Sequence, residues 1–129
     1  MTEFVLDASA LLALLRGELG GARVAHALTD SAMTTVNFAE VAGHYIRNGG
    51  GEAEIRALLD PLPISLAPFD RELAYQAGIL LSVTRAAGLS LGDRACLALA
   101  RRLDVPALTA DQAWQTIAAQ AGVRVELIR

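Results

Sequence analysis

Short apolar segments alternate with longer stretches of helical spacing along the whole chain, and this alternation narrows the possible folds more than any other feature. Compact runs rich in branched and apolar residues predict strands, and apolar residues every three or four positions predict helices. Such a chain forms a mainly parallel sheet with helices on both faces. The predicted strands are 3–6, 32–35, 63–67, 105–109 and 123–127.

The intervening segments predict helices. The Ala- and Leu-rich segment 70–87 is predicted as one long helix that ends at Gly88. The segment LSLGDRACLALA predicts a helix whose apolar surface includes Leu91, Ala95 and Leu99. The full set of predicted helices is 9–15, 20–28, 36–47, 52–59, 70–87, 91–103 and 112–120.

Composition predicts one globular domain over residues 1–129. Hydrophobic residues make up 53% of the chain and charged residues 19%, which argues against disorder. No apolar run approaches the ~18 residues of a membrane helix, and the start MTEFVLD has no basic cluster of a signal peptide. The single cysteine excludes an internal disulfide. We therefore expect a cytoplasmic protein without membrane association.

The net charge is −3, and every basic side chain is arginine rather than lysine. This charge weakens a nucleic-acid interpretation without excluding it. An enzyme that holds cations in an acidic pocket can have a negative net charge and still bind RNA.

Four acidic residues stand out because apolar sequence surrounds them: Asp7, Glu40, Asp93 and Asp111. Each has a sufficient local explanation. Asp7 and Asp111 are placed to cap the helices that follow them. Glu40 with Asn37, and Asp93 with Ser90, have the spacing of a capping box. Taken one at a time, capping is the better explanation.

The joint pattern favours a second explanation. In a parallel α/β sheet, the carboxyl ends of strands and the starts of the following helices share one edge. Two of the four acids end predicted strands and two begin predicted helices, so all four are expected at that edge. Close carboxylates are costly unless some are protonated or a cation lies between them. Hard oxygen donors suit Mg²⁺ or Mn²⁺, and such ions support phosphodiester hydrolysis.

The motifs FVLDASALLALL, NFAEV, LSLGDRACLALA and LTADQAW, in this order, resemble those of PIN-domain ribonucleases. The chain length is similar to that of the toxin subunits of VapBC-type toxin–antitoxin pairs. The resemblance implies a PIN-like three-layer α/β fold with about five strands. It also implies a Mg²⁺- or Mn²⁺-dependent endoribonuclease in which metal-activated water attacks RNA. A cognate antitoxin and a homodimer are the implied protein partners.

By this resemblance, the metal-binding and catalytic residues are Asp7, Glu40, Asp93 and Asp111. Capping remains a sufficient role for Asp111. Four neighbours are candidates for orienting the ligands: Ser9, Asn37, Thr109 and Arg94. For Ser9 and Thr109, a plain helix cap is an equally good explanation. Asn37 is better explained as a helix cap, and Arg94 as an ion-pair partner.

Two other classes compete with the nuclease interpretation. A non-catalytic PIN-like module would keep the fold and bind RNA or a protein, but it would not need four costly carboxylates. A phosphohydrolase or phosphoacceptor domain on another α/β sheet is the third interpretation. A haloacid-type phosphatase requires an aspartate where Ser9 stands, and a receiver-type domain requires a lysine, which the chain lacks.

Overall fold

Five short strands form one sheet in the order β3-β2-β1-β4-β5, in a computed structural model that describes residues 1–129. Every neighbouring pair is parallel, which confirms the predicted fold class. The strand bounds are β1 Phe4–Leu6, β2 Ser31–Thr34, β3 Ser65–Ala67, β4 Ala107–Thr109 and β5 Val125–Leu127.

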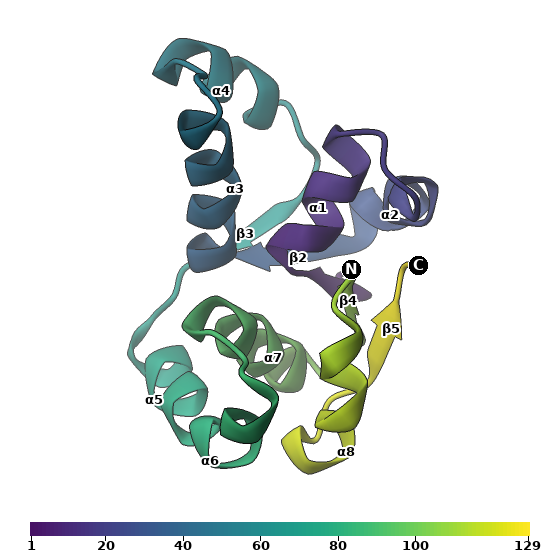
Figure 1. The fold of residues 1–129 in the computed structure, drawn as a ribbon, viewed down its shortest axis with the longest axis vertical. Helices are drawn as coiled ribbons and strands as arrows, with labels where there is room; N and C mark the ends of the chain where they lie inside the picture. Colours follow the sequence, from purple (N-terminus) through teal and green to yellow (C-terminus); the bar gives the residue numbers. More distant parts are fainter.

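Helices cover both faces of the sheet (Figure 1). One layer holds α1 Ala8–Leu15, α2 Gly21–Ala27, α3 Thr35–Arg47 and α4 Glu52–Leu59. The other holds α5 Arg71–Ile79, α6 Leu81–Thr84, α7 Leu91–Leu103 and α8 Ala118–Ala121. Short 3₁₀ helices are η1 Leu28–Asp30, η2 Arg85–Ala87 and η3 Gln112–Thr116. No helix has both the length and the apolar character that crossing a membrane requires.

Alternating side chains of the strands divide the apolar core in two. Val5 packs in the cluster beneath α5 and α7, whereas its neighbour Leu6 packs in the cluster beneath α1 and α3. Ala107 and Leu108 in β4 divide in the same way. This is the two-residue period of a strand. Because helices bury both faces of the sheet, the sequences of these strands are almost continuously apolar.

The order of the strands creates a switch point between β1 and β4. From β1 the chain proceeds through β2 to β3, and it then crosses to the other side of β1 to form β4. The two strands pair in register at Leu6 and Leu108, so the residues that follow them emerge side by side. Crevices at such switch points are the usual ligand sites of open α/β sheets.

Two contacts align α7 antiparallel to α5. At the start of α7, Arg94 Nη1 donates a hydrogen bond to the carbonyl of Ala77 at 2.9 Å. At its end, Arg102 Nη2 donates to Asp70 Oδ1 at 2.9 Å, and Asp70 is also the N-cap of α5. The first turn of α7 is thereby held at the carboxyl edge of the sheet.

The predicted single helix 70–87 is wrong in one respect, because the segment is divided at Leu80 into α5, α6 and η2. The hydroxyl of Ser82 donates to the carbonyl of Ile79 at 3.1 Å. The hydroxyl of Thr84 donates to the carbonyl of Leu80 at 2.9 Å. Hydroxyl bonding to a preceding carbonyl competes with the helical ladder and bends helices.

The predicted helix 112–120 is also divided, at Ile117, into η3 and α8. Trp114 and Ile117 are both buried in the cluster beneath α7. The three-residue period of a 3₁₀ helix aligns these two side chains on one side.

A further correction concerns Leu91 at the start of α7, which is 50% exposed rather than part of a buried apolar surface.

Candidate functional site

Asp7 follows β1 and is the N-cap of α1, as predicted. Its side chain is 4% exposed, and its Oδ1 accepts a hydrogen bond from the Ala10 backbone N–H at 2.8 Å. The Ser9 hydroxyl donates to Oδ1 at 2.8 Å, and the Thr109 hydroxyl donates to Oδ2 at 2.5 Å. A cap needs one carboxylate oxygen, whereas here both oxygens are held.

Burial raises the pKa of Asp7 to about 6. Hydrogen bonds from Thr109, Ala10 and Ser9 lower the pKa again, and the negative charge of Asp93 raises it. A cation beside this carboxyl group would favour its ionised form.

Ser9 and Thr109 connect the ends of the two central strands. The Ser9 hydroxyl accepts a hydrogen bond from the Ala110 backbone N–H at 2.9 Å. The Thr109 hydroxyl accepts one from the Asp111 backbone N–H at 3.0 Å. Ser9 is therefore not a plain helix cap. Both hydroxyls bond to the Asp7 carboxylate from opposite sides of the switch point.

Glu40 lies on the surface of α3, one turn after Asn37. Asn37 Nδ2 donates a hydrogen bond to Glu40 Oε1 at 2.9 Å. The predicted capping role of Asn37 is wrong, because Thr34 is the N-cap of α3 and its hydroxyl accepts from the Asn37 backbone N–H. The Asn37 amide is 1% exposed and holds the Glu40 side chain instead.

Asp93 forms the predicted capping box with Ser90 at the start of α7. Asp93 Oδ2 accepts a hydrogen bond from the Ser90 backbone N–H at 2.8 Å, and the Ser90 hydroxyl accepts from the Asp93 backbone N–H at 3.2 Å. The other oxygen of the Asp93 carboxylate receives no hydrogen bond from the protein. Capping and a second role are thus compatible for this residue.

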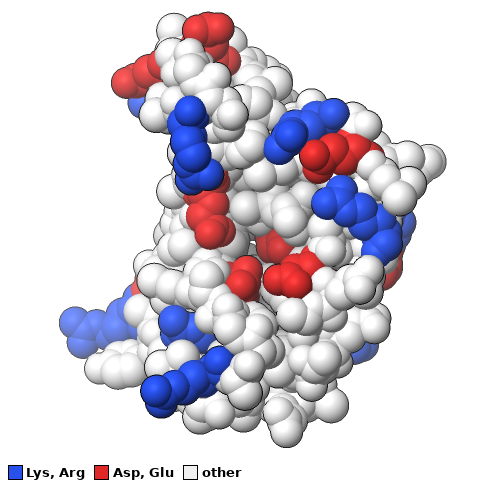
Figure 2. Space-filling model, viewed as in Figure 1, with Lys and Arg blue, Asp and Glu red and all other residues white.

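Asp7, Glu40 and Asp93 form one electrostatic group, the carboxylate cluster. Partial removal from water raises the pKa of Glu40, the Asn37 hydrogen bond lowers it, and the charge of Asp93 raises it. Cys96 lies fully buried in α7, and burial followed by the charges of all three acids raises the pKa of its thiol. Figure 2 shows acidic side chains gathered around a hollow in the middle of this face.

Asp111 lies outside this electrostatic group. It is exposed at the start of η3, where its Oδ1 accepts a hydrogen bond from the Ala113 backbone N–H at 3.0 Å. The predicted cap is confirmed. Its backbone is joined to Asp7 through Thr109, so it belongs to the same edge of the sheet.

The predicted ion pair of Arg94 is wrong. None of the ion pairs in the structure includes this residue. Its guanidinium bonds to the carbonyl of Ala77 in α5, and its buried Nε has no partner. Arg94 therefore positions α7 rather than neutralising an acid.

Sequence reasoning missed Gly92, which lies directly against the Glu40 carboxylate. A glycine inside an otherwise Ala- and Leu-rich helix lowers helix stability relative to alanine. Such a glycine indicates close approach of another group, and this was the available signal. The sequence does not reveal which group approaches, because that group is the Glu40 carboxylate of a different helix, α3.

The carboxylate cluster is not a ready-made metal centre, since no three Asp, Glu, His or Cys side chains are arranged around a common ion position. Asp7, Glu40 and Asp93 each turn at least one oxygen toward a neighbouring protein donor. Their chemistry nevertheless fits a hard divalent cation, because all donors are carboxylate oxygens whose mutual repulsion a cation relieves.

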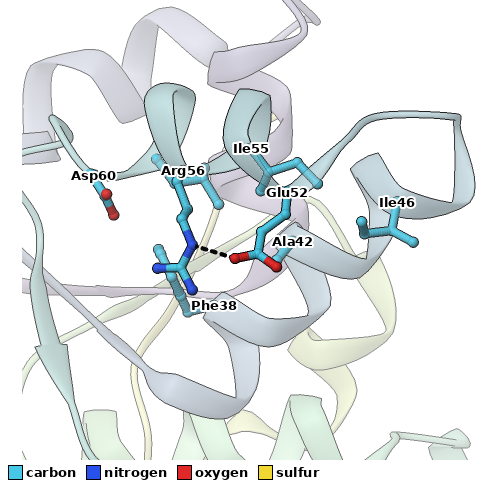
Figure 3. A pocket seen from close by; sticks show the side chains of 8 residues that line it. Phe38, Ala42, Ile46, Glu52, Ile55, Arg56 and Asp60 are labelled. Carbon is cyan, nitrogen blue, oxygen red and sulfur yellow. Dashed lines mark hydrogen bonds and ion pairs between the residues drawn. The ribbon is translucent and has the colours of Figure 1, made fainter.

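A separate apolar groove lies between α3 and α4 (Figure 3). Phe38, Ala42 and Ile46 line it from α3, and Ile55 and Leu59 line it from α4. An exposed ion pair between Glu52 and Arg56 spans 3.0 Å at its rim. The groove offers apolar contacts rather than metal ligands.

The fold and the cluster define an α/β protein with an acidic site at the carboxyl edge of a parallel sheet. The sequence matches the family model of the PIN domain over residues 4–120, and the chain belongs to this family. No curated protein matches the sequence.

Solved structures share the fold at low sequence identity. A DNA-bound VapBC complex from Salmonella typhimurium is 13% identical, with 100% of both chains covered and a TM-score of 0.77. A toxin–antitoxin complex from Klebsiella pneumoniae is 17% identical, with 98% of both chains covered and a TM-score of 0.74. VapC20 of Mycobacterium tuberculosis, a sarcin–ricin loop cleaving toxin, is 17% identical over 88% of this chain and 94% of that chain, with a TM-score of 0.72.

Proposed function

We propose that this PIN-domain protein is a metal-dependent endoribonuclease that hydrolyses RNA phosphodiester bonds and acts as the toxin of a toxin–antitoxin pair. The carboxylate cluster at the switch point carries the proposal. Maintaining like charges beside each other is costly, and local capping needs neither their proximity nor the burial of Asp7. Family membership and the toxin structures of similar fold support the same conclusion.

Asp7, Glu40 and Asp93 are the proposed ligands for Mg²⁺ or Mn²⁺, with Asp111 as a fourth acid on the adjoining loop. A bound divalent cation would supply charge stabilisation at the phosphodiester and activation of the attacking water. Chain residues supply orientation: Ser9 and Thr109 hold Asp7, and Asn37 holds Glu40. Asp93 has an oxygen free of protein donors, and its charge acts on the other two acids.

The proposed protein partner is an antitoxin that closes the acidic site. Similar folds occur in structures described as VapBC and toxin–antitoxin complexes. The apolar groove between α3 and α4 is on the helix that carries Glu40. Apolar side chains of a partner segment seated there would place the rest of that segment near the carboxylate cluster.

A homodimer is the proposed assembly of the toxin chain. Tyr75 and Ile79 on α5 are 61% and 60% exposed, and Leu81 on α6 is 43% exposed. Large apolar side chains grouped on one surface favour association.

The test is cleavage of a cellular RNA pool by the purified chain, with Mn²⁺, with Mg²⁺ and with chelator. We expect metal-dependent cuts with 5′-phosphate and 3′-hydroxyl ends. Asp93→Asn should lower cleavage by more than about 100-fold. Loss of a proposed ligand should cost more than loss of a residue that only orients a ligand, for which the effect reaches about 100-fold. The stability of this variant should fall by no more than about 1 kcal/mol, because asparagine still accepts the capping hydrogen bond.

Asp104→Asn is the matched control, because it makes the same change at a side chain that is 100% exposed. This variant should cleave like the wild type. Cleavage that persists in chelator, or in Asp93→Asn, would contradict the metal mechanism. A folded chain that binds RNA without cutting it under any condition would favour the non-catalytic binding module.

A further inference from the structure

Helices α3 and α7 touch at the point where each carries one acid of the carboxylate cluster. Gly92 immediately precedes Asp93, and the Glu40 carboxylate rests against it. A Cβ atom at Gly92 would lie 2.5 Å from Glu40 Oε1 and 2.6 Å from its Cδ, closer than such atoms can approach. A side chain at position 92 would therefore displace the Glu40 carboxylate from the place it occupies.

Asn37 connects the same two helices from within the protein. Its Nδ2 donates to Glu40 Oε1 at 2.9 Å and also to the carbonyl of Gly92 at 2.9 Å. Both N–H groups of the amide are therefore used, one on each helix. The side chain is 1% exposed, so water does not compete for these bonds.

Thr34 fixes the direction of the Asn37 amide. The Thr34 hydroxyl accepts from the Asn37 backbone N–H at 3.1 Å and donates to Asn37 Oδ1 at 2.7 Å. With its oxygen occupied on that side, the amide must present its N–H groups to Glu40 and Gly92. The orientation is thus set by the N-cap of α3.

We infer that Asn37 and Gly92 are positioning residues that set the separation between the Glu40 and Asp93 carboxylates. Together with Glu40 they form the α3–α7 junction. The Asn37 amide donates hydrogen bonds to Glu40 and to the Gly92 carbonyl in the first turn of α7. Because Gly92 has no side chain, the Glu40 carboxylate can lie close to α7. The inference rests on the proposed function, because it assigns the junction to the binding of a divalent cation. Partners that orient metal ligands affect metal affinity without touching the ion.

The test is calorimetric titration of the metal-free full chain with Mn²⁺. We expect Asn37→Ala and Gly92→Ala each to weaken Mn²⁺ binding by about 10-fold or more. Gly92→Ala is informative because alanine is the better helix former, so weaker binding there cannot come from a weaker helix. Asn48→Ala is the matched control, since Asn48 is an exposed residue at the end of α3 that bonds to the His44 carbonyl. It should bind Mn²⁺ like the wild type.

A double-mutant cycle separates positioning from general stability. In a Glu40→Ala background, adding Asn37→Ala should weaken Mn²⁺ binding by less than it does in the wild-type background, because part of its effect passes through Glu40. An additive loss there, or unchanged affinity in both Asn37→Ala and Gly92→Ala, would overturn the inference while the proposed function stands. If Asn37→Ala does not fold, the same cycle is made with Gly92→Ala. A wild-type chain that binds no Mn²⁺ would overturn the proposed metal site and the junction's role together.

Discussion

Asp7 is the only charged residue that the fold buries. At the scale of the residue, its position is unfavourable in the absence of a cation, because burial raises its pKa to about 6 from an ordinary value of 3.8. The hydroxyls of Ser9 and Thr109 offset part of that cost. The proposed role of Asp7 as a metal ligand accounts for this placement better than the cap that it also provides.

The raised pKa predicts how the stability of the metal-free chain depends on pH. Because the folded chain holds the Asp7 proton more tightly than the unfolded chain, the contribution of Asp7 to stability is greatest below pH 4. It then falls as the pH rises through the window from about 4 to about 6. The loss attributable to Asp7 is about 3 kcal/mol by the linkage of pKa to unfolding. Urea unfolding in chelator across this range measures it.

Asp7→Asn should remove this pH dependence and leave the metal-free chain more stable than wild type at pH 7. Asparagine retains an oxygen for the Ala10 N–H and carries no charge to bury. Asp104→Asn, at an exposed turn, should retain the wild-type profile. Equal pH profiles for Asp7→Asn and wild type would show that burial of Asp7 does not govern its titration.

At the scale of the element, α7 was predicted with its observed bounds, whereas 70–87 was not. The start of α7 is encoded locally, by Ser90 and Asp93 three residues apart. The division at Leu80 depends on which hydroxyls bond to carbonyls and on how α5 packs against α7. Neither is visible in the spacing of apolar residues, which continues across the break.

Removing the cap of α7 gives a prediction of stability. Ser90→Ala deletes the hydroxyl that accepts from the Asp93 backbone N–H, and it should lower the free energy of unfolding by about 1 kcal/mol. Urea unfolding at constant pH is the measurement. Ser82→Ala removes an exposed hydroxyl elsewhere and should change stability by less than about 0.5 kcal/mol. Equal losses in the two variants would argue against a specific capping contribution.

At the scale of the whole molecule, topology explains which part of the site was predictable. Asp7 and Asp111 follow adjacent strands of a parallel sheet, so their common edge follows from the strand pattern alone. Contact between Asn37 and Gly92 joins residues 55 positions apart. It depends on the approach of two helices in opposite layers, which apolar spacing does not encode. Hence the sequence predicts the acids at this edge, and it does not predict the junction that orients Glu40.

The proposed homodimer is a prediction about the surface of α5. Arg71, Ala74, Tyr75, Gly78 and Ile79 form a shallow, mostly apolar depression. Ile79→Arg replaces an apolar side chain of this depression with a charge and should convert a dimer to a monomer, as measured by sedimentation equilibrium. Leu19→Arg changes a side chain that is 79% exposed outside this surface, and should remain dimeric. A wild-type chain that is monomeric throughout would refute the proposed assembly.

The burial of Cys96 beneath the carboxylate cluster has a consequence for oxidation chemistry. Thiolate, rather than thiol, reacts with peroxides and disulfides. Burial and three neighbouring negative charges keep this sulfur protonated, and it is 0% exposed. The single sulfhydryl of the chain is therefore shielded from oxidants and electrophiles while the protein is folded, so oxidative stress has no direct chemical route to the site through this residue.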